Sequence, residues 1–330
     1  MKAWQVTAHG EPADVLALAE VAVPTPAPGQ VLVRVRAAAL NFPDVLLCRG
    51  QYQIRPELPF VPGVEFCGEV VELGDEVPGV DPPKVGARVI GNPALPHGAL
   101  AEYALMNAAE AFSAPASLDD AEASALHIAY QTGWFALHRR ARLQAGETLL
   151  VHAAAGGVGS AAVQLGKAAG ARVIAVVGGP EKAETARRLG ADLVVDRRAE
   201  DFVAVVKQAT QGLGVDVVFD PVGGEAYTGS ARCAAFEGRI VVVGFAGGSV
   251  PAPPLNHALI KNYSILGLHW GLYKQRDPAA VAAAHAELGE LAAAGTIKPL
   301  IGGRYSLEQA AEALTALGAG ESVGRLIILP

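Results

Sequence analysis

Cysteine is scarce in this chain of 330 residues, and its three cysteines, Cys48, Cys67 and Cys233, are scattered. Because they form no Cys-x-x-Cys pair, they predict neither a disulfide framework nor a cysteine-rich metal site. Cysteines without partners are typical of a reducing compartment, and we expect the cytoplasm. Basic residues are also in the minority, with 26 Lys and Arg against 33 Asp and Glu and a net charge of −7. Nucleic-acid binding requires a basic stripe, so we do not expect it.

Long apolar runs are missing as well. The chain begins Met1-Lys-Ala-Trp-Gln-Val, without the apolar stretch of a secretory signal peptide. The longest charge-free run worth testing as a membrane span lies between Glu147 and Lys167, but it contains His152, Gln164 and a glycine cluster. That run divides into a strand and a helix, so we expect no membrane insertion. The apolar content of 51% and the 38 glycines are instead typical of a globular α/β protein.

The rest of the chain is organised around one glycine-rich segment. Residues 148–153 are apolar enough for a buried strand, Gly156, Gly157 and Gly159 follow in a turn, and a helix of small residues ends at Gly170. Glycine lets a backbone bend sharply, approach a pyrophosphate and pack a helix closely on a strand. Phosphates bind at a helix N-terminus, where free N–H groups and the helix dipole favour negative charge. The segment therefore predicts a dinucleotide site.

The match to G-x-G-x-x-G is imperfect, because Ala154 stands at the first glycine position. The context supports it, since residues 172–177 supply the next strand of a βαβ unit; the alternative is a glycine turn that binds nothing. About 20 residues past the turn, where NAD-binding proteins carry an acidic residue, this chain has Val177. A 2′-phosphate would be tolerated there and paired by Lys182 or Arg197, which favours NADP. The alternative for Lys182 is a solvated helix residue.

The two ends of the chain differ in pattern from its middle. Residues 31–36 alternate as a half-buried strand does, residues 63–72 and 87–90 are further strands, and many prolines are expected to break up any helix and mark loops. Residues 1 to about 125 thus predict a small barrel with functional loops. From about Ala121 the chain is rich in alanine, and strands alternate with helices, which predicts a parallel sheet with helices on both faces. The expected helices are 121–138, 181–189, 201–210 and 226–236, and the expected strands are 193–195, 215–219, 239–243 and 263–268.

The C-terminal part predicts a helix over residues 278–295 and a strand–helix–strand over residues 301–330. Its apolar end, Arg325-Leu-Ile-Ile-Leu329, requires a sheet to join. Pairing with the N-terminal domain would make that domain discontinuous.

Several ordered motifs cover almost the whole chain. They are Ala39-Leu-Asn-Phe-Pro-Asp44, Arg49-Gly-Gln-Tyr52, Pro62-Gly-Val-Glu65, His152-Ala-Ala-Ala-Gly-Gly-Val-Gly159, Val215-Asp-Val-Val-Phe-Asp-Pro-Val-Gly-Gly224, Gly238-Arg-Ile-Val-Val-Val-Gly244 and Gly324-Arg-Leu-Ile-Ile-Leu329. On these motifs the chain resembles the medium-chain dehydrogenase/reductase superfamily and, within it, the zinc-free NADPH:quinone oxidoreductases of the zeta-crystallin-like branch. The resemblance implies an α/β fold with a GroES-like β-barrel catalytic domain (residues 1–125 and 272–330) and a doubly wound parallel Rossmann domain (residues 126–271). It also implies a homodimer paired along the Rossmann edge, at residues 260–268.

The resemblance also bears on metal binding. Zinc-dependent relatives carry a cysteine where this chain has Asn41 and a histidine where it has Val64. Valine cannot ligate a metal and asparagine is a poor zinc ligand, so we expect no zinc. Cys48 and Cys67 are then expected to be small core residues.

The resemblance implies roles for named residues. Asn41 and Tyr52 are expected to line the substrate pocket as hydrogen-bond donors, and Asp44 to orient their loop. The alternatives are a turn residue for Asn41 and a packed aromatic for Tyr52. Leu46 stands where close relatives carry a second tyrosine, which weakens the case for a tyrosine-lined pocket. The residues expected to contact the cofactor, NADPH, are Asn41, Thr132, Ala155, Gly156, Gly157, Val158, Gly159, Lys182, Arg197, Gly244 and Phe245.

The expected activity is therefore zinc-free, NADPH-dependent reduction of a quinone or of an activated alkene such as an α,β-unsaturated carbonyl. Without a metal as Lewis acid, an acceptor that is already electrophilic is the natural substrate. Two alternatives stay open: an enoyl-thioester reductase acting on coenzyme A or carrier-linked chains, and a non-catalytic NADPH-binding protein of the crystallin type.

Overall fold

The computed structural model describes residues 1–79 and 81–330 and divides into two compact units. The first unit joins Met1–Ile128 to Lys298–Pro330, and the second is Ala129–Ile297. Both chain ends thus belong to the first unit. The second boundary differs from expectation, because residues 272–297 belong with the second unit.

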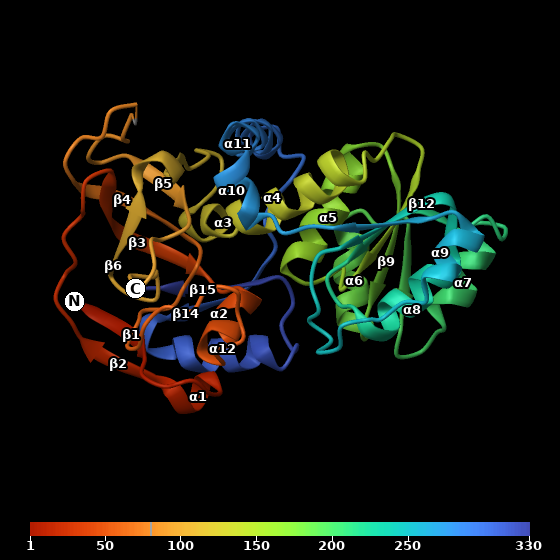
Figure 1. Ribbon diagram of the computed structural model, residues 1–330, viewed down its shortest axis with the longest axis horizontal. Coiled ribbons are helices and arrows are strands. Elements are labelled where there is room, and N and C mark those ends of the chain that lie inside the picture. Colours follow the sequence, from red (N-terminus) through yellow and green to blue (C-terminus); the bar gives the residue numbers. More distant parts are fainter. Residues whose placement is uncertain (80) are drawn as a thin grey trace. The chain divides into compact units, whose positions relative to one another are not determined.

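The first unit contains a seven-stranded sheet (Figure 1). Its strands follow the order β14-β15-β3-β4-β5-β7, and β6 also pairs with β3. The apolar C-terminal strand finds its sheet here, since β15 pairs antiparallel with β3 through Ile327 opposite Ala39 and Ile328 opposite Ala38. The strand bounds are β3 Gln30–Ala39, β4 Phe66–Leu73, β5 Arg88–Gly91, β6 Tyr103–Asn107, β7 Phe112–Ser113, β14 Ile301–Ser306 and β15 Arg325–Leu329, with β1 Lys2–Val6 and β2 Leu16–Glu20 forming a separate pair.

Helices also occur in the first unit. The expectation that prolines exclude helices there was wrong for α2, Phe42–Cys48, whose Pro43 stands in the first turn. Proline is tolerated at that place because the N–H it lacks would have no partner inside the helix. The N-cap of this helix is the candidate site residue Asn41. The other helices are α1 Pro12–Val15, η1 Ala108–Glu110, α3 Asp120–Ser124, η3 Leu307–Gln309 and α12 Ala310–Gly318.

The second unit is built on a six-stranded parallel sheet in the order β10-β9-β8-β11-β12-β13 (Figure 1). The order changes direction between β8 and β11, which is where doubly wound sheets bind their ligands. The strands are β8 Thr148–His152, β9 Arg172–Val177, β10 Leu193–Asp196, β11 Val215–Asp220, β12 Ala234–Val242 and β13 Ser264–Gly267. The helical segments are α4 His127–Trp134, η2 Phe135–Arg140, α5 Gly157–Ala168, α6 Pro180–Arg188, α7 Phe202–Ala209, α8 Gly224–Cys233, α9 Leu255–Lys261, α10 Gly271–Arg276 and α11 Pro278–Ala293.

Two details of the second unit differ from the sequence prediction. Helix α8 ends at Cys233, and residues 234–236, expected in that helix, begin β12 instead. Helix α11 is held in this unit by Gln131, whose Nε2 donates to the Val281 carbonyl at 2.9 Å, and by Trp134, whose Nε1 donates to Glu287 at 2.9 Å. Among the described residues, no helix has the length and apolarity that crossing a membrane requires.

Candidate active site and cofactor site

The predicted residues divide between the two units. Asn41, Asp44 and Tyr52 belong to the first unit, and all the other predicted cofactor contacts belong to the second.

The glycine turn after β8 is closed by backbone hydrogen bonds. The Gly156 N–H donates to the Ala153 carbonyl at 2.8 Å, and Ala153 adopts a left-handed φ of 49°. A Cβ on Gly159 would lie 2.1 Å from the Ala153 oxygen, so no other residue fits there without moving the backbone. Glycine is therefore required at 159 by this close approach of helix and strand.

Helix α5 starts directly from this turn. Its N-cap is Gly156, which has no side chain to accept from the first N–H groups of the helix. Those groups and the helix dipole together form a site for an anion such as a phosphate. Residues 156–159 thus fit the pyrophosphate role that the sequence predicts, with Ala155 buried behind them.

The end of β9 lies against two arginines. A Cβ on Gly178 would stand 3.5 Å from Nε and Nη2 of Arg197 and 3.4 Å from Nε of Arg198. Gly179 has a φ of 101°, which residues with side chains rarely adopt. The predicted Arg197 is therefore beside the strand end where a dinucleotide ribose binds, and Arg198 is a neighbour that the sequence reading missed. Lys182 lies in the first turn of α6.

A loop after β12 places the predicted residues Gly244 and Phe245 beside the β11–α8 turn. The Ala246 N–H donates to the Pro221 carbonyl at 3.0 Å. The Phe245 ring packs against Gly223, where an added Cβ would lie only 2.8 Å from the ring. The carboxyl ends of β11 and β12 thus meet at this loop. Thr132 is buried in α4, with 7% of its surface exposed.

His152, the last residue of β8, is buried at the same sheet edge. Its Nε2 lies 2.7 Å from the Ser230 hydroxyl. Burial lowers its pKa to about 4, so the imidazole is neutral at pH 7 and is poorly suited to protonate a substrate.

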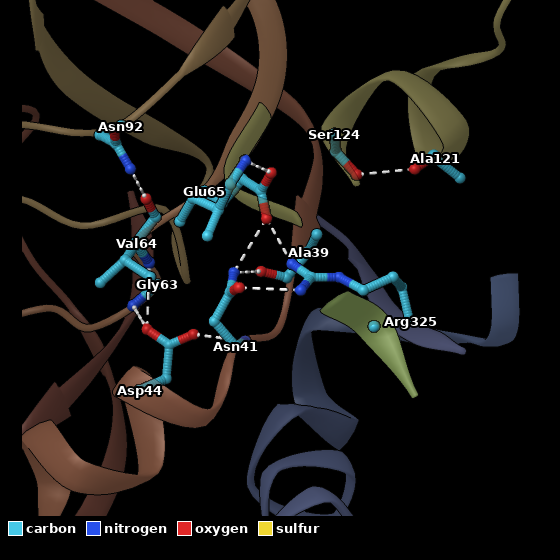
Figure 2. A network of polar contacts seen from close by, with 12 residues as sticks. Ala39, Asn41, Asp44, Gly63, Val64, Glu65, Asn92, Ala121, Ser124 and Arg325 are labelled. Atoms are coloured by element: carbon cyan, nitrogen blue, oxygen red, sulfur yellow. Dashed lines mark hydrogen bonds and ion pairs between the residues drawn. The ribbon is translucent and has the colours of Figure 1, made fainter. Parts of the chain in front are cut away.

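In the first unit, Asn41 is part of a buried polar network (Figure 2). Its Nδ2 donates to the Ala39 carbonyl at 3.0 Å and to Glu65 Oε2 at 2.9 Å, while its Oδ1 accepts from Arg325 Nη1 at 2.8 Å. These partners fix the orientation of the amide, since two are acceptors and one is a donor. Both side-chain N–H groups of Asn41 thus already donate hydrogen bonds within the chain. The expected donation to a substrate would require one of these hydrogen bonds to break.

Glu65 and Arg325 complete this network. Their side chains are buried and ion-paired, and Glu65 Oε1 also accepts from the Ile128 N–H at 2.6 Å. Burial raises the pKa of the Glu65 carboxyl, and the charge of Arg325 lowers it in opposition. The guanidinium group thus partly offsets the cost of burying the charge of Glu65.

Asp44 fastens the loop of residues 62–65 to the start of α2. Its Oδ2 accepts from the Asn41 N–H at 2.8 Å, and its Oδ1 accepts from the N–H groups of Gly63 and Val64, each at 3.0 Å (Figure 2). Complete burial raises the pKa of Asp44 to about 7, while the three N–H groups favour the charged form. Its geometry is that of a residue that orients a loop.

Tyr52 packs on an apolar cluster that includes Leu47, Cys48 and Phe60. Within the described part of the chain its hydroxyl has no hydrogen-bond partner, which leaves it able to donate. Burial, and then the charge of Asp44, raise its pKa, so the phenol keeps its proton at neutral pH.

The positions of the zinc ligands in zinc-dependent relatives hold no zinc donor set here. Asn41 has its amide engaged as described, and Val64 is aliphatic. Cys67 is not one of these positions but is close to them in sequence; its thiol lies 3.7 Å from Asp120, and burial raises its pKa to about 12. A thiol that holds its proton is a poor ligand. Among the described residues, no group of three or more His, Cys, Asp and Glu side chains gathers as a metal site would require.

Comparison with known proteins agrees with both units. Residues 27–116 match the alcohol dehydrogenase GroES-like domain, and residues 157–286 match the zinc-binding dehydrogenase family. The chain is 38% identical over 302 residues to quinone oxidoreductase-like protein 2 of Bos taurus, covering 91% of this chain and 85% of that protein. This chain is a member of the medium-chain dehydrogenase/reductase superfamily, in its quinone oxidoreductase-like branch.

Two other relatives of this quinone oxidoreductase-like chain are informative. The crystal structure of Escherichia coli quinone oxidoreductase complexed with NADPH superposes with a TM-score of 0.91 at 31% identity, over 100% of both chains. A phthioceranic/hydroxyphthioceranic acid synthase of Mycobacterium tuberculosis is 35% identical over 308 residues, which are 92% of this chain and 14% of that protein.

The sequence reading of this quinone oxidoreductase-like chain missed Glu65 and Arg325 as site residues, although both stand in the motifs that carried the resemblance. The available signal was a charge in an apolar setting, since Arg325 opens the strand Arg325-Leu-Ile-Ile-Leu329. A buried charge of that kind requires a partner.

Proposed function

We propose that this chain is an NADPH-dependent reductase of quinones or of activated alkenes. The observation that carries the proposal is the pairing, in one unit, of the uncapped glycine turn at α5 with two arginines above Gly178. The first feature fits a pyrophosphate and the second fits a 2′-phosphate. The Bos taurus and Escherichia coli relatives, named as quinone oxidoreductases or like them, support the choice of acceptor.

The residues of the second unit would hold the cofactor. Residues 155–159 would bind the pyrophosphate, and Lys182 and Arg197 the 2′-phosphate. Thr132, Gly244 and Phe245 would contact the nicotinamide half. When bound, NADPH supplies a hydride to an electrophilic acceptor.

The acceptor becomes an oxyanion as it is reduced, and this charge requires a hydrogen-bond donor and a proton. In the first unit Tyr52 has a protonated hydroxyl with no partner among the described residues, so we assign this donation to Tyr52. Asn41, whose two side-chain N–H groups both donate within the chain, holds the start of α2 together with Asp44. For Asn41 to contact the cofactor or the acceptor as a donor, one of these hydrogen bonds would have to break. Quinones and enones are electrophilic without a Lewis acid. This agrees with a reaction that uses no zinc, since Asn41 and Val64 replace the zinc ligands of zinc-dependent relatives.

The experiment that tests this function is NADPH consumption at 340 nm by protein treated with EDTA. A simple quinone, a conjugated enone and an enoyl-coenzyme A thioester are offered in parallel. Turnover of the quinone or the enone that survives the chelator supports the proposal. Binding of NADPH without turnover of any acceptor would favour a non-catalytic protein and contradict it.

A second candidate function is an enoyl-thioester reductase acting on coenzyme A or carrier-linked chains. It is favoured by one observation, the 35% identity to a segment of the mycobacterial acid synthase. Turnover of the thioester well above the quinone and the enone would select this function.

We also propose a homodimer formed along the β13 edge of the Rossmann sheet. β13 pairs only with β12 in the described sheet, and the adjacent helix α9 exposes Leu255, Leu259 and Ile260, at 75%, 75% and 71%. Apolar side chains with this much exposed surface, beside an unpaired sheet edge, fit an interface between two copies of the chain.

The oligomeric state is measured by light scattering after size exclusion. We expect a dimer for the unchanged protein and a monomer for Leu259→Glu. The control is Leu213→Glu, which alters a leucine that is 77% exposed and lies outside α9 and β13. A monomer before any substitution would contradict the interface.

The three free cysteines are buried, and we propose the cytoplasm as the compartment on the ground that none is paired.

A further inference from the structure

The two arginines at the end of β10 converge on one point. That point is where a Cβ would stand on Gly178, and it lies within 3.5 Å of guanidinium nitrogens from both Arg197 and Arg198. Because Gly178 has no side chain, both guanidinium groups lie close to its bare Cα. Gly179 is equally bare and lies under Arg198, whose Nη1 would be 3.2 Å from a Cβ there.

Neither guanidinium group makes a hydrogen bond or an ion pair with any residue that the structure describes. Two like charges that share one space repel each other unless an anion lies between them. A phosphate is the anion whose oxygens match a pair of guanidinium groups best. The two guanidinium groups beside Gly178 therefore offer the charge and the N–H donors that a phosphate requires.

Asp196 stands next to this pair in sequence, and within the described part of the chain its carboxylate forms no ion pair with either guanidinium group. Its Oδ1 accepts from the Gly179 N–H at 2.8 Å and from the Arg198 N–H at 3.0 Å. These two backbone bonds tie the exit of β9 to the backbone of Arg198 and hold the pKa of Asp196 below its usual range. The carboxylate thus links Gly179 to the backbone of Arg198.

We propose that Asp196 is a positioning residue for cofactor selection: it fixes Arg198 beside Arg197 over Gly178 and Gly179, so that both arginines grip the 2′-phosphate. An acidic residue near the ribose thereby supports NADPH binding. The inference rests on the NADPH site of the proposed function and adds Arg198 and Asp196 to it.

The opposite role for Asp196 would be to accept a hydrogen bond from a ribose hydroxyl, as acidic residues do in NAD-binding proteins. Its Oδ1 already accepts two backbone N–H groups, and two cations stand beside it, so the observations favour the positioning role. The two roles make opposite predictions for ligands with and without a 2′-phosphate.

The test is calorimetric titration of the full chain with adenosine 2′,5′-bisphosphate and with 5′-AMP, which differ only in the 2′-phosphate. The variants are Arg198→Gln, Asp196→Ala, Asp196→Asn and the double variant Asp196→Ala with Arg198→Gln. The matched control is Arg187→Gln, which removes an exposed charge from the last turn of α6. Circular dichroism checks that each variant is folded, and Asp196→Asn keeps the test open if the alanine variant is not.

We expect Arg198→Gln to weaken binding of the bisphosphate about tenfold to a hundredfold and to change that of 5′-AMP less than about twofold. Asp196→Ala should weaken the bisphosphate selectively, Asp196→Asn should restore most of the affinity because its amide oxygen still accepts, and the double variant should bind like Arg198→Gln alone. The control should bind like the unchanged protein.

The proposal is overturned if Asp196→Ala weakens 5′-AMP as much as the bisphosphate, or if its effect adds in full to that of Arg198→Gln. It is also overturned if Arg198→Gln binds the bisphosphate normally. No acceptor is turned over in this titration, so a failed reductase assay does not affect the result of the titration. Likewise, a negative result for Asp196 and Arg198 does not affect the reductase assay.

Discussion

The guanidinium group of Arg325 is ion-paired with the carboxylate of Glu65, 260 residues earlier in the chain (Figure 2). Both side chains are buried, so each charge depends on the other. The same guanidinium also donates to Asn41, which links the last strand of the chain to the start of α2. The two ends of the discontinuous first unit are therefore joined at the candidate site itself.

Removing the Arg325 side chain should lower the stability of the first unit. Arg325→Ala leaves Glu65 buried without its partner, and we expect a loss of about 3–5 kcal/mol in the free energy of unfolding. The control is Arg304→Ala, which removes a largely exposed ion pair with Asp119 and should cost less than about 1 kcal/mol. Urea titration followed by circular dichroism measures both. Equal losses of unfolding free energy in the two variants would show that the buried ion pair contributes no more to stability than the exposed one.

Asp44 should make the stability of the protein depend on pH. Its pKa of about 7 in the folded chain lies above its ordinary value of 3.8, so the folded state binds the proton more tightly. The stability that this proton contributes is complete below about pH 4 and is lost as the pH rises towards 7, by at most about 1.4 kcal/mol per pH unit.

Asp44→Asn removes this titration, since asparagine does not ionise. We expect the difference in unfolding free energy between the unchanged protein and Asp44→Asn to shift against the unchanged protein between pH 4.5 and pH 7. Urea titrations across that interval measure it. A difference that stays constant with pH would contradict the raised pKa.

Gly159→Ala should damage the glycine turn. The added Cβ would lie 2.1 Å from the Ala153 oxygen, and moving that backbone should cost about 1–3 kcal/mol. Affinity for NADPH, measured by fluorescence titration, should fall with it because the first turn of α5 is displaced. The control is Gly289→Ala on α11, where a Cβ meets nothing within 4 Å; it should leave stability unchanged or raise it by up to about 1 kcal/mol. Normal NADPH affinity in Gly159→Ala would separate this turn from cofactor binding.

Much of the fold follows from local pattern. The strands of the Rossmann sheet are apolar runs bounded by glycine and separated by helices, so β9 has the bounds that the sequence predicts and β8, β10 and β11 differ by one residue. The pairing of β15 could also be predicted, because an apolar strand at the end of a chain must join a sheet. The end of α8 was missed because residues 234–236 are compatible with a helix, and only pairing with β11 makes them a strand.

The contacts within the candidate site were harder to predict from the sequence. Asn41 meets Glu65 and Arg325 across separations of 24 and 284 residues, and no local pattern encodes such contacts. Sequence reasoning named Asn41 and Tyr52 through resemblance, but which of the two has a free hydrogen-bond donor is a matter of tertiary packing. Arg198 was missed for a similar reason, since its neighbour across space is Gly178 on another strand end.

Tyr52→Phe should slow the reaction without unfolding the protein. The hydroxyl has no partner among the described residues, so its loss should change the unfolding free energy by less than about 0.5 kcal/mol. If Tyr52 donates to the reduced acceptor, kcat should fall about a hundredfold or more while the affinity for NADPH stays the same. Tyr305→Phe, which alters another partly buried tyrosine of the first unit, is the matched control. An unchanged kcat in Tyr52→Phe would remove Tyr52 from the chemistry.

The central claim is that this chain is a zinc-free reductase that uses NADPH, and one measurement tests it most directly. The purified protein is dialysed against EDTA and given a simple quinone with either NADPH or NADH, and oxidation of the nicotinamide is followed at 340 nm. We predict quinone-dependent oxidation that persists after dialysis and is faster with NADPH than with NADH at low cofactor concentration. Activity that disappears with the chelator and returns with Zn²⁺, or a preference for NADH, would contradict the account.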